Sequence, residues 1–194
     1  MFQRNSPGLM QVFSQAGFLT PAQCVEIRRG MDAGEVEQAA VLADGIRHDR
    51  EARVASLVEP PGNFARDIEA KLDACRQRVA EALGMSLGGR EGAGFIRYPA
   101  GGFYRAHRDR GDDPQWPPAA RRAAAVVLFL NGSRASGAEG DFNGGILRLH
   151  PPDGTIDVVP EAGLLIAFPA DVLHEVTEVR DGTRDTIVDW YYEA

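Results

Sequence analysis

Basic residues other than arginine are almost absent from this 194-residue sequence. Lys71 is the only lysine, so arginine supplies the other 20 of the 21 Lys+Arg residues, and 28 Asp+Glu residues leave a formal net charge of −7. No run of Lys and Arg interrupts this acidic balance. General nucleic-acid binders need a basic surface that neutralises phosphates. We therefore expect no nucleic-acid partner.

Cysteines and long apolar runs are also scarce. Two cysteines, Cys24 and Cys75, cannot form a disulfide framework or a four-thiolate zinc site. No stretch approaches the roughly 20 apolar residues of a membrane span. Residues 1–8 lack the apolar core of a secretory signal. We expect a cytoplasmic protein with no membrane partner.

The composition that remains is globular, with 44% hydrophobic and 25% charged residues. The length suits one domain over residues 1–194, and no repeat or linker divides it. The patterns described next indicate a mostly helical support region over residues 1–92 and a β core over residues 93–194.

Two helices are expected in the first half. Thr20 followed by Pro21 is typical of a helix start and predicts a helix to about Met31. A second helix is predicted over Phe64–Leu83, with Asn63 as its cap and Gly84 at its end. Its apolar positions recur at steps of three or four residues and form one face. These positions are Phe64, Ile68, Leu72, Cys75, Val79 and Leu83. The segment between the helices is ambiguous, with a strand near residues 52–58 as one interpretation.

Short strands separated by turns are expected from Gly94 onward. The predicted strands are Phe95–Tyr98, Phe103–His107, Ala124–Leu130, Ile146–His150, Thr155–Val159, Leu164–Phe168, Leu173–Val179 and Arg184–Tyr192. Many short strands after a helical start predict a sandwich or barrel supported by helices.

The four histidines include one pair with suitable neighbours for a metal. His107 and Asp109 lie two residues apart where a strand enters a loop, so both can face one point. His174 follows inside an apolar strand. Two imidazoles and one carboxylate form the facial triad of non-haem Fe(II) oxygenases, which leaves coordination positions open. We expect His48 and His150 not to be ligands.

Arg184 lies ten residues after His174, across the turn signal Asp181-Gly182. If the two strands form a hairpin, Arg184 lies roughly 16 Å along it from His174. After the reach of the arginine is subtracted, the gap suits a five-carbon diacid bound to the metal. A guanidinium grips a carboxylate through two parallel hydrogen bonds. For both side chains to share a face, the hairpin needs an odd loop or a bulge.

The sequence resembles the prolyl 4-hydroxylase-type 2-oxoglutarate/Fe(II) dioxygenases. The resemblance rests on residues 98–109 (YPAGGFYRAHRD), 144–149 (GGILRL), 169–176 (PADVLHEV) and 184–192. It implies a mainly β fold, a double-stranded β-helix (jelly-roll) core with N-terminal α-helices. It also implies Fe(II) held by His107, Asp109 and His174, with Arg184 on the distal carboxylate of 2-oxoglutarate and Tyr98 lining the cosubstrate pocket.

The resemblance further implies the reaction. In the family, O2 decarboxylates 2-oxoglutarate to succinate and CO2, and the resulting ferryl oxygen abstracts a substrate hydrogen before hydroxyl rebound. The expected cofactor and cosubstrates are Fe(II), 2-oxoglutarate and O2, with ascorbate as an optional addition. The expected substrate is a prolyl residue in a protein or peptide. The alternative substrates are a free amino acid or another small molecule. The alternative functions are a jelly-roll metal-binding protein and a binding module, both without oxygenase activity. The oligomeric state is left open.

Departures from the family pattern concern the cosubstrate pocket and the loops. One branch of the family hydroxylates prolines of transcription factors, and it has a tyrosine that helps to hold the distal carboxylate of 2-oxoglutarate. Phe129 stands at that position here, so we expect Arg184 to hold the carboxylate alone or with a partner such as Thr186. The loops over residues 110–122 and 132–144 are longer than in that branch, and loops usually select the substrate. The roles of three other residues are left open. Trp116 is either a lid aromatic or a turn residue, and Arg148 is either structural or directed at the substrate. Trp190 is either an aromatic of the pocket wall or a core aromatic.

Overall fold

Short strands dominate the computed structural model, which describes residues 10–42, 46–134 and 140–194. The strands before residue 93 are β1 (Phe13–Gln15), β2 (Glu35–Gln38), β3 (Val41–Leu42), β4 (Ile46–Arg47), β5 (Arg53–Val54), β6 (Ser56–Glu59) and β7 (Leu87–Arg90). The later strands are β8 (Gly94–Tyr98), β9 (Phe103–His107), β10 (Arg122–Phe129), β11 (Phe142–Gly144), β12 (Leu147–His150), β13 (Ile156–Val158), β14 (Leu165–Pro169), β15 (Leu173–Val176), β16 (Val179–Gly182) and β17 (Arg184–Glu193). The helices are α1 (Pro21–Asp32), α2 (Phe64–Leu83) and the short 3-10 helix η1 (Pro117–Arg121).

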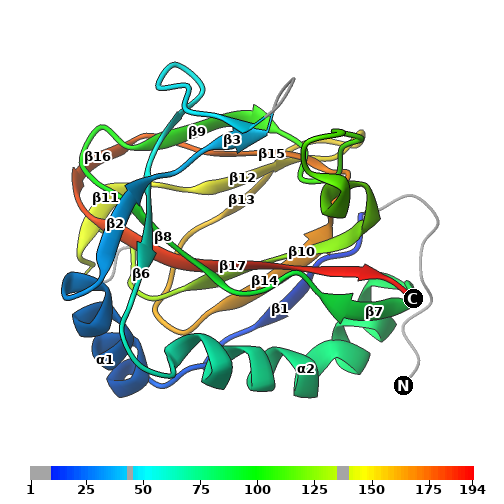
Figure 1. Cartoon of the computed structure of the whole chain (residues 1–194), viewed down its shortest axis with the longest axis horizontal. Helices are drawn as coiled ribbons and strands as arrows, with labels where there is room; N and C mark the ends of the chain where they lie inside the picture. Colours follow the sequence, from blue (N-terminus) through cyan, green and yellow to red (C-terminus); the bar gives the residue numbers. More distant parts are fainter. Residues whose placement is uncertain (1–9, 43–45, 135–139) are drawn as a thin grey trace.

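Two sheets face each other across the centre of the molecule (Figure 1). The larger has the order β1-β14-β10-β17-β8-β6-β2, with β7 also paired to β17. The smaller has the order β13-β12-β15-β9-β5. Every residue of β10 is buried, because this strand is covered on both faces. The arrangement is the predicted mainly β fold, with a double-stranded β-helix core and helices outside it.

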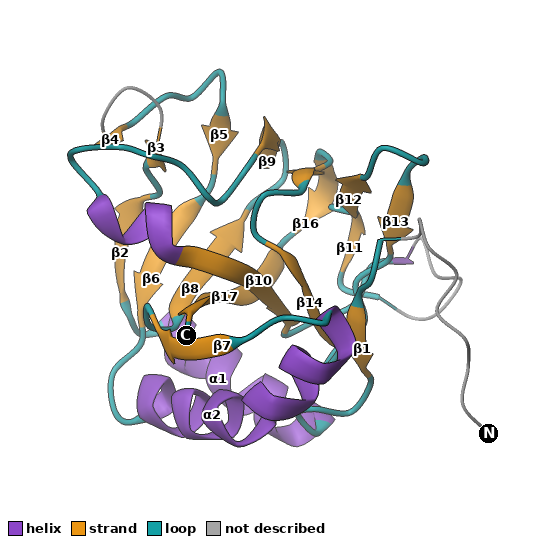
Figure 2. Cartoon of the chain, turned by 90° about the vertical axis from the view of Figure 1, so that its right-hand side faces the viewer, coloured by secondary structure: helices purple, strands orange, loops and turns teal. Residues whose placement is uncertain are grey.

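The two helices cover the outer face of the larger sheet (Figure 2). Thr20 caps α1 as predicted, and its side chain and Gln23 form a reciprocal capping box. The bounds of α2 agree with the prediction, and Gly84 ends it in the left-handed conformation at φ +65°. Asn63 precedes α2 but makes no side-chain cap, so that part of the prediction was wrong.

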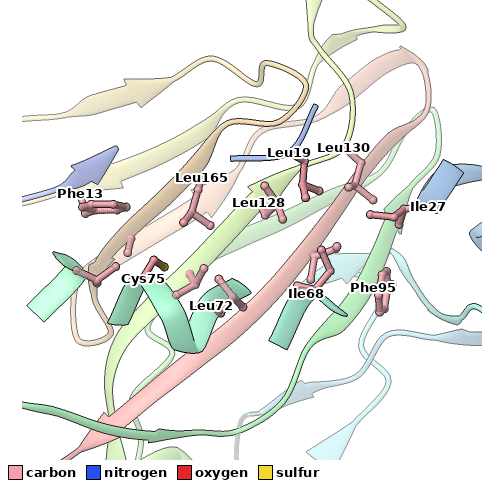
Figure 3. Packing of buried hydrophobic residues seen from close by; sticks show 14 of the residues in the cluster. Phe13, Leu19, Ile27, Ile68, Leu72, Cys75, Phe95, Leu128, Leu130 and Leu165 are labelled. Carbon is pink, nitrogen blue, oxygen red and sulfur yellow. The ribbon is translucent and has the colours of Figure 1, made fainter. Parts of the chain in front are cut away.

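The apolar face of α2 packs against the larger sheet (Figure 3). Ile68, Leu72 and Cys75 belong to one cluster with Leu128 and Leu165 of the sheet. Cys75 is buried there as a free cysteine, and so is Cys24 of α1. This contact explains why apolar residues at steps of three or four correctly predicted the helix, since the sheet can cover only one stripe of the helix surface.

The region before residue 93 is less helical than expected. In addition to α1 and α2 it contributes β2 and β6, which extend the larger sheet beyond β8, and β5, which extends the smaller sheet beyond β9. The sequence pattern is ambiguous here, with a strand near residues 52–58 as one interpretation, and β5 and β6 occupy that segment.

The predicted hairpin between His174 and Arg184 is wrong. The run Leu173–Val179 is broken, because β15 pairs with β12 and β9, whereas β16 pairs with β11. β17 then enters the larger sheet between β10 and β8. Between the strands, Thr177 N donates to Ile146 O (2.9 Å) and Val179 N donates to Gly102 O (2.8 Å). These bonds to loop residues turn the chain from one sheet toward the other.

Two predictions concern residues that are only partly described. Residues 1–8, where a secretory signal would begin, lie outside the described residues, as do residues 135–139 of the loop over 132–144. Within the described part of the chain, no helix has the length and hydropathy needed to span a bilayer.

We predict that Leu72→Ala destabilises the fold by about 2–5 kcal/mol, since Leu72 is fully buried between α2 and the sheet. Urea unfolding followed by circular dichroism measures the free energy of unfolding. Arg66→Ala is the matched control, because Arg66 is exposed on the same helix, and we expect a change within about 0.5 kcal/mol. Equal stabilities of the two variants would contradict the packing described.

Candidate active site

His107, Asp109 and His174 converge at one point between the sheets. β9 ends at His107, Asp109 follows it, and His174 of β15 pairs directly with His107 across the smaller sheet. One ligand atom from each residue lies within 4.8 Å of the others. His107 Nε2 lies 3.5 Å from Asp109 Oδ1, and His174 Nε2 lies 3.5 Å from Asp109 Oδ2. The structure therefore brings together the three residues that the sequence singled out.

Backbone carbonyls orient both imidazoles. His107 Nδ1 lies 2.8 Å from Arg105 O, and His174 Nδ1 lies 2.9 Å from Val172 O. A carbonyl only accepts hydrogen bonds, so each Nδ1 carries the proton in these contacts. Each Nε2 is then left with a free lone pair directed at the common point, as a metal ligand requires.

The electrostatics favour the ligand forms of the acid and of the buried histidine. Burial by itself would raise the pKa of Asp109, but the facing His174 and His107 hold that pKa well below its usual range. Burial lowers the pKa of His174, although Asp109 opposes this. Near neutral pH the site therefore contains a carboxylate and a neutral His174 imidazole, which can bind a divalent cation without first losing protons.

Arg184 is a buried cation that forms no ion pair with a carboxylate of the described residues. It is 1% exposed, its Nη1 donates to Thr186 Oγ1 (3.3 Å), and its Nε has no hydrogen-bond partner. Aromatic rings surround it, with its guanidinium carbon 4.9 Å from the Tyr98 centroid and 5.3 Å from that of Phe129. Burial lowers the pKa of Arg184 to about 10. Thr186, suggested by the sequence as a second residue for the carboxylate, thus contacts Arg184 itself, and Phe129 contributes only its ring.

Gly145 makes room for Arg184. A Cβ built on Gly145 would lie 2.9 Å from Arg184 Cδ and 2.8 Å from the Phe142 ring, and the residue has φ +61°. Its neighbour Gly144 has φ +79° and would place a Cβ 2.1 Å from Glu178 O. A side chain at position 145 would therefore collide with Arg184 and Phe142, and one at position 144 would collide with the backbone of Glu178, which gives the glycine pair in the GGILRL stretch a physical reason.

One cavity of about 380 Å³ contains both the triad and Arg184. Its wall includes Tyr98, as expected, and Val126, Leu147, Val176 and Val188 make much of it apolar. His174 and Arg184 therefore line one cavity, but not from one face of a hairpin as predicted. The two residues meet because they lie on facing sheets.

Strand alternation in β17 separates the cavity from the core. Arg184, Val188 and Trp190 line the cavity, whereas Ile187 and Tyr191 belong to the cluster beneath α2. The residues between the cavity positions also include two buried aspartates. Asp185 is 0% exposed and is bound by Arg97 (Nε–Oδ1 2.7 Å) and Arg28 (Nε–Oδ2 3.0 Å), and Asp189 pairs with Arg90. These ion pairs hold β17 in place through residues that alternate with those lining the cavity.

Sequence reasoning missed two groups of residues near the triad. In the first, Tyr104 stacks on His107 with ring centroids 3.5 Å apart. The guanidinium carbon of Arg53 lies over the Tyr104 ring, 4.5 Å from its centroid. Tyr104 stands three residues before His107, in the stretch that carries the resemblance. Arg53 lies in the segment that the sequence left ambiguous, so no local signal identified it.

The second group is centred on Glu91. Arg122 donates to Glu91 (Nε–Oε2 2.6 Å) and to Asp109 O (3.0 Å), and its guanidinium carbon lies 3.7 Å from the Trp190 centroid. Trp116, which is 38% exposed and lines the cavity, donates its indole N–H to Glu91 Oε1 (3.0 Å). Trp116 and Trp190 are thus both cavity-wall residues, tied together through Glu91 and Arg122.

The remaining candidates lie away from the cavity wall. Arg148 forms a bidentate ion pair with Asp157 on the neighbouring strand (2.7 and 2.8 Å). His150 Nε2 lies 3.1 Å from Glu175 Oε1. His48 is exposed. None of the three contributes to the metal-ligand group found among the described residues.

Known proteins share this fold and part of this sequence. A PKHD-type hydroxylase of Prochlorococcus marinus (strain NATL2A) is 33% identical over 99 residues, which cover 51% of this chain and 40% of that protein. The matched segment thus spans less than half the length of this relative. A prolyl-4-hydroxylase of Pseudomonas putida superposes with a TM-score of 0.73 at 29% identity, over 95% of this chain and 94% of that one.

A more distant structure confirms the fold alone. It is a prolyl hydroxylase from Trichoplax adhaerens in complex with a hypoxia inducible factor peptide fragment, with a TM-score of 0.76, 21% identity, and coverage of 94% of this chain and 84% of that one. A family model matches the second half of the chain. The sequence model of the 2OG-Fe(II) oxygenase superfamily matches residues 93–192, which contain the triad, Tyr98 and Arg184. The chain therefore belongs to the 2OG-Fe(II) oxygenase superfamily, whose members use Fe(II), 2-oxoglutarate and O2.

Proposed function

We propose that this chain is a hydroxylase that depends on 2-oxoglutarate and O2, with Fe(II) held by His107, Asp109 and His174. The observation that carries the proposal is the burial of Arg184 in the cavity of the triad, where no carboxylate of the described residues forms an ion pair with it. A site that bound only a metal would have no use for this cation. A diacid that reaches from the triad to Arg184 would neutralise it.

The residues present fit both groups. Two imidazoles and a carboxylate on one side of a metal are the donors of non-haem Fe(II) oxygenases, and the open side faces the cavity. The unpartnered Nε of Arg184 and its planar fork fit a carboxylate oxygen pair. When bound, Fe(II) together with 2-oxoglutarate would activate O2 for hydroxylation of the substrate, and succinate and CO2 would form beside the hydroxylated product.

The chain's own residues position the reactants. Arg184 holds the distal carboxylate of the diacid, and Thr186 holds one arm of the guanidinium. We assign to Tyr98 a hydrogen bond from its hydroxyl to the same ligand, since its ring lies beside Arg184. The apolar walls contributed by Val126, Leu147 and Val188 exclude water, which strengthens these polar contacts.

A prolyl residue in a protein or peptide is the proposed substrate. Support comes from the Pseudomonas putida prolyl-4-hydroxylase, which is 29% identical to this chain over almost its full length. A free amino acid is the second candidate, because the cavity of about 380 Å³ is large enough for one beside the cosubstrate. Ascorbate stays an optional predicted addition, and the cytoplasmic location and the absence of a nucleic-acid partner stay predictions.

The direct test is incubation of the purified chain with Fe(II), O2 and labelled 2-oxoglutarate, with and without a peptide pool. We expect labelled succinate, and a 16-dalton mass gain on a peptide that requires 2-oxoglutarate. If no succinate forms under either condition and no visible absorption band develops when Fe(II) and 2-oxoglutarate are added without O2, the proposal is wrong.

For the metal site, we predict that His174→Ala lowers the affinity for Mn(II) more than about 100-fold, since it removes one of three ligands. Isothermal titration calorimetry measures this. His150→Ala is the control, because His150 lies on the adjacent strand and pairs with Glu175 instead. A similar loss in both variants would contradict the assignment.

For the cosubstrate site, we predict that Arg184→Met weakens 2-oxoglutarate binding about 10–100-fold while it stabilises the ligand-free fold by roughly 1–2 kcal/mol. The opposite signs arise because the buried charge is unfavourable until a carboxylate neutralises it. A pKa lowered to about 10 means that this penalty is present throughout the range below pH 10, so both measurements can be made at pH 7.

Calorimetry gives the affinity and urea unfolding gives the stability of Arg184→Met. Arg148→Met is the matched control, since Arg148 is paired with Asp157 away from the cavity and should leave 2-oxoglutarate binding unchanged. Unchanged affinity in Arg184→Met would remove Arg184 from the cosubstrate site.

A further inference from the structure

A second cation with unused donors lines the same cavity. Arg53 of β5 pairs in register with Tyr104 of β9, so both side chains lie on one face of the smaller sheet. The guanidinium carbon lies 4.5 Å from the Tyr104 centroid, and Tyr104 stacks in turn on His107. A single aromatic ring therefore separates Arg53 from a residue of the triad.

Only part of the hydrogen-bonding capacity of Arg53 is used. Its Nη1 donates to Ala40 O (2.9 Å), whereas its buried Nε has no partner. Among the interactions of the described residues, none pairs Arg53 with a carboxylate. A guanidinium presents five donors, so Arg53 keeps donors for a ligand.

The three arginines of the cavity wall differ in their need for an anion. Arg122 is neutralised by Glu91 (Nε–Oε2 2.6 Å). Arg184 is assigned above to one end of 2-oxoglutarate, whose other end faces the triad. Arg53 is half-buried, nearer to solvent than Arg184, and nothing assigned so far neutralises it.

We propose that Arg53 is a specificity-determining residue that binds a carboxylate of the primary substrate. The inference rests on the proposed function, because it assumes that Arg184 takes the cosubstrate. The carboxylate belongs either to an acidic residue next to the hydroxylated one or to the hydroxylated amino acid itself. In both cases it lies beside Tyr104, with the reacting carbon toward the triad.

Matched acidic and neutral ligands test this. The probes are N-acetyl-Glu-Pro-Gly-amide against its Gln analogue, N-acetyl-Gly-Pro-Glu-amide against its Gln analogue, and L-proline against L-prolinamide. Dissociation constants are measured by ligand-observed NMR on the chain loaded with Mn(II) and 2-oxoglutarate, without turnover. For at least one pair, we expect the wild type to bind the carboxylate form about tenfold more tightly. The pair that shows the preference identifies the source of the carboxylate.

We expect Arg53→Gln to reduce that ratio to about one. Arg105→Gln is the matched control, because Arg105 also lies over an aromatic ring, 4.6 Å from the Phe103 centroid, but is exposed and does not line the cavity. It should retain the wild-type ratio. If Arg53→Gln fails to fold, Arg53→Lys keeps the charge but loses the planar fork, and we expect the ratio to fall about threefold.

Three outcomes overturn the proposal. One is a ratio near one, or no measurable binding, for every pair in the wild type. Another is a ratio that Arg53→Gln, or Arg53→Lys where the glutamine variant does not fold, leaves at its wild-type value. The third is a loss of 2-oxoglutarate affinity in Arg53→Gln as large as in Arg184→Met, which would assign Arg53 to the cosubstrate. Failure of the hydroxylase function itself is seen separately, as an absence of succinate in the turnover assay.

Discussion

The burial of the Arg184 guanidinium among aromatic rings is the constraint on which the rest of the site depends. A cation that is 1% exposed and has no carboxylate partner is unfavourable, and its lowered pKa expresses that cost. The chain therefore has to hold Arg184 in place by other contacts. Thr186 accepts one hydrogen bond from it, and Gly145 packs against its stem where no side chain would fit. The same cost would favour an anionic ligand, because a carboxylate that reached Arg184 would neutralise the buried charge.

The scaffold holds Arg184 through the opposite face of the same strand. Asp185, fully buried, is bound by Arg97 of β8 and Arg28 of α1, so one carboxylate joins the strand, its neighbour in the sheet and the first helix. Its backbone N–H donates to Asn131 Oδ1 (3.0 Å), which fixes the beginning of β17. The α2 helix packs under Ile187 and Tyr191 further along. The helices are thus more than a cover for the sheet, because they fix the strand whose other face carries the site.

Much of this could be predicted from the sequence, and the failures have a common cause. The bounds of α2 and β9 follow from local signals. For α2 the signal is a periodic apolar face ended by Gly84, and for β9 it is the run of residues before His107. The triad was found because its donors lie in short, recognisable stretches. The break after Val176 could not be found, since it accompanies hydrogen bonds that Thr177 N and Val179 N donate to Ile146 O and Gly102 O, which are far away in the sequence. The position of Arg53 depends likewise on its pairing with Tyr104, about fifty residues later. Register between distant strands leaves little trace in either segment.

Under the roles proposed above, the exposure of the charged groups implies an order of binding. Among the residues that line the cavity, Arg184 is 1% exposed, Arg53 is half-buried and Trp116 is 38% exposed. A substrate carboxylate on Arg53 would then lie nearer to solvent than a diacid on the more deeply buried Arg184, and the diacid would have to enter first. The cavity wall carries the Asp109 carboxylate and the guanidinium groups of Arg53 and Arg184, neither of which forms an ion pair with a carboxylate of the described residues, and a divalent cation would add further positive charge. Each anion that entered would lower the repulsion among the positive groups. A cosubstrate on Arg184, as proposed, would leave Arg53 as the remaining attraction for the second ligand. The charges of the cavity wall would thus favour a fixed sequence of occupation.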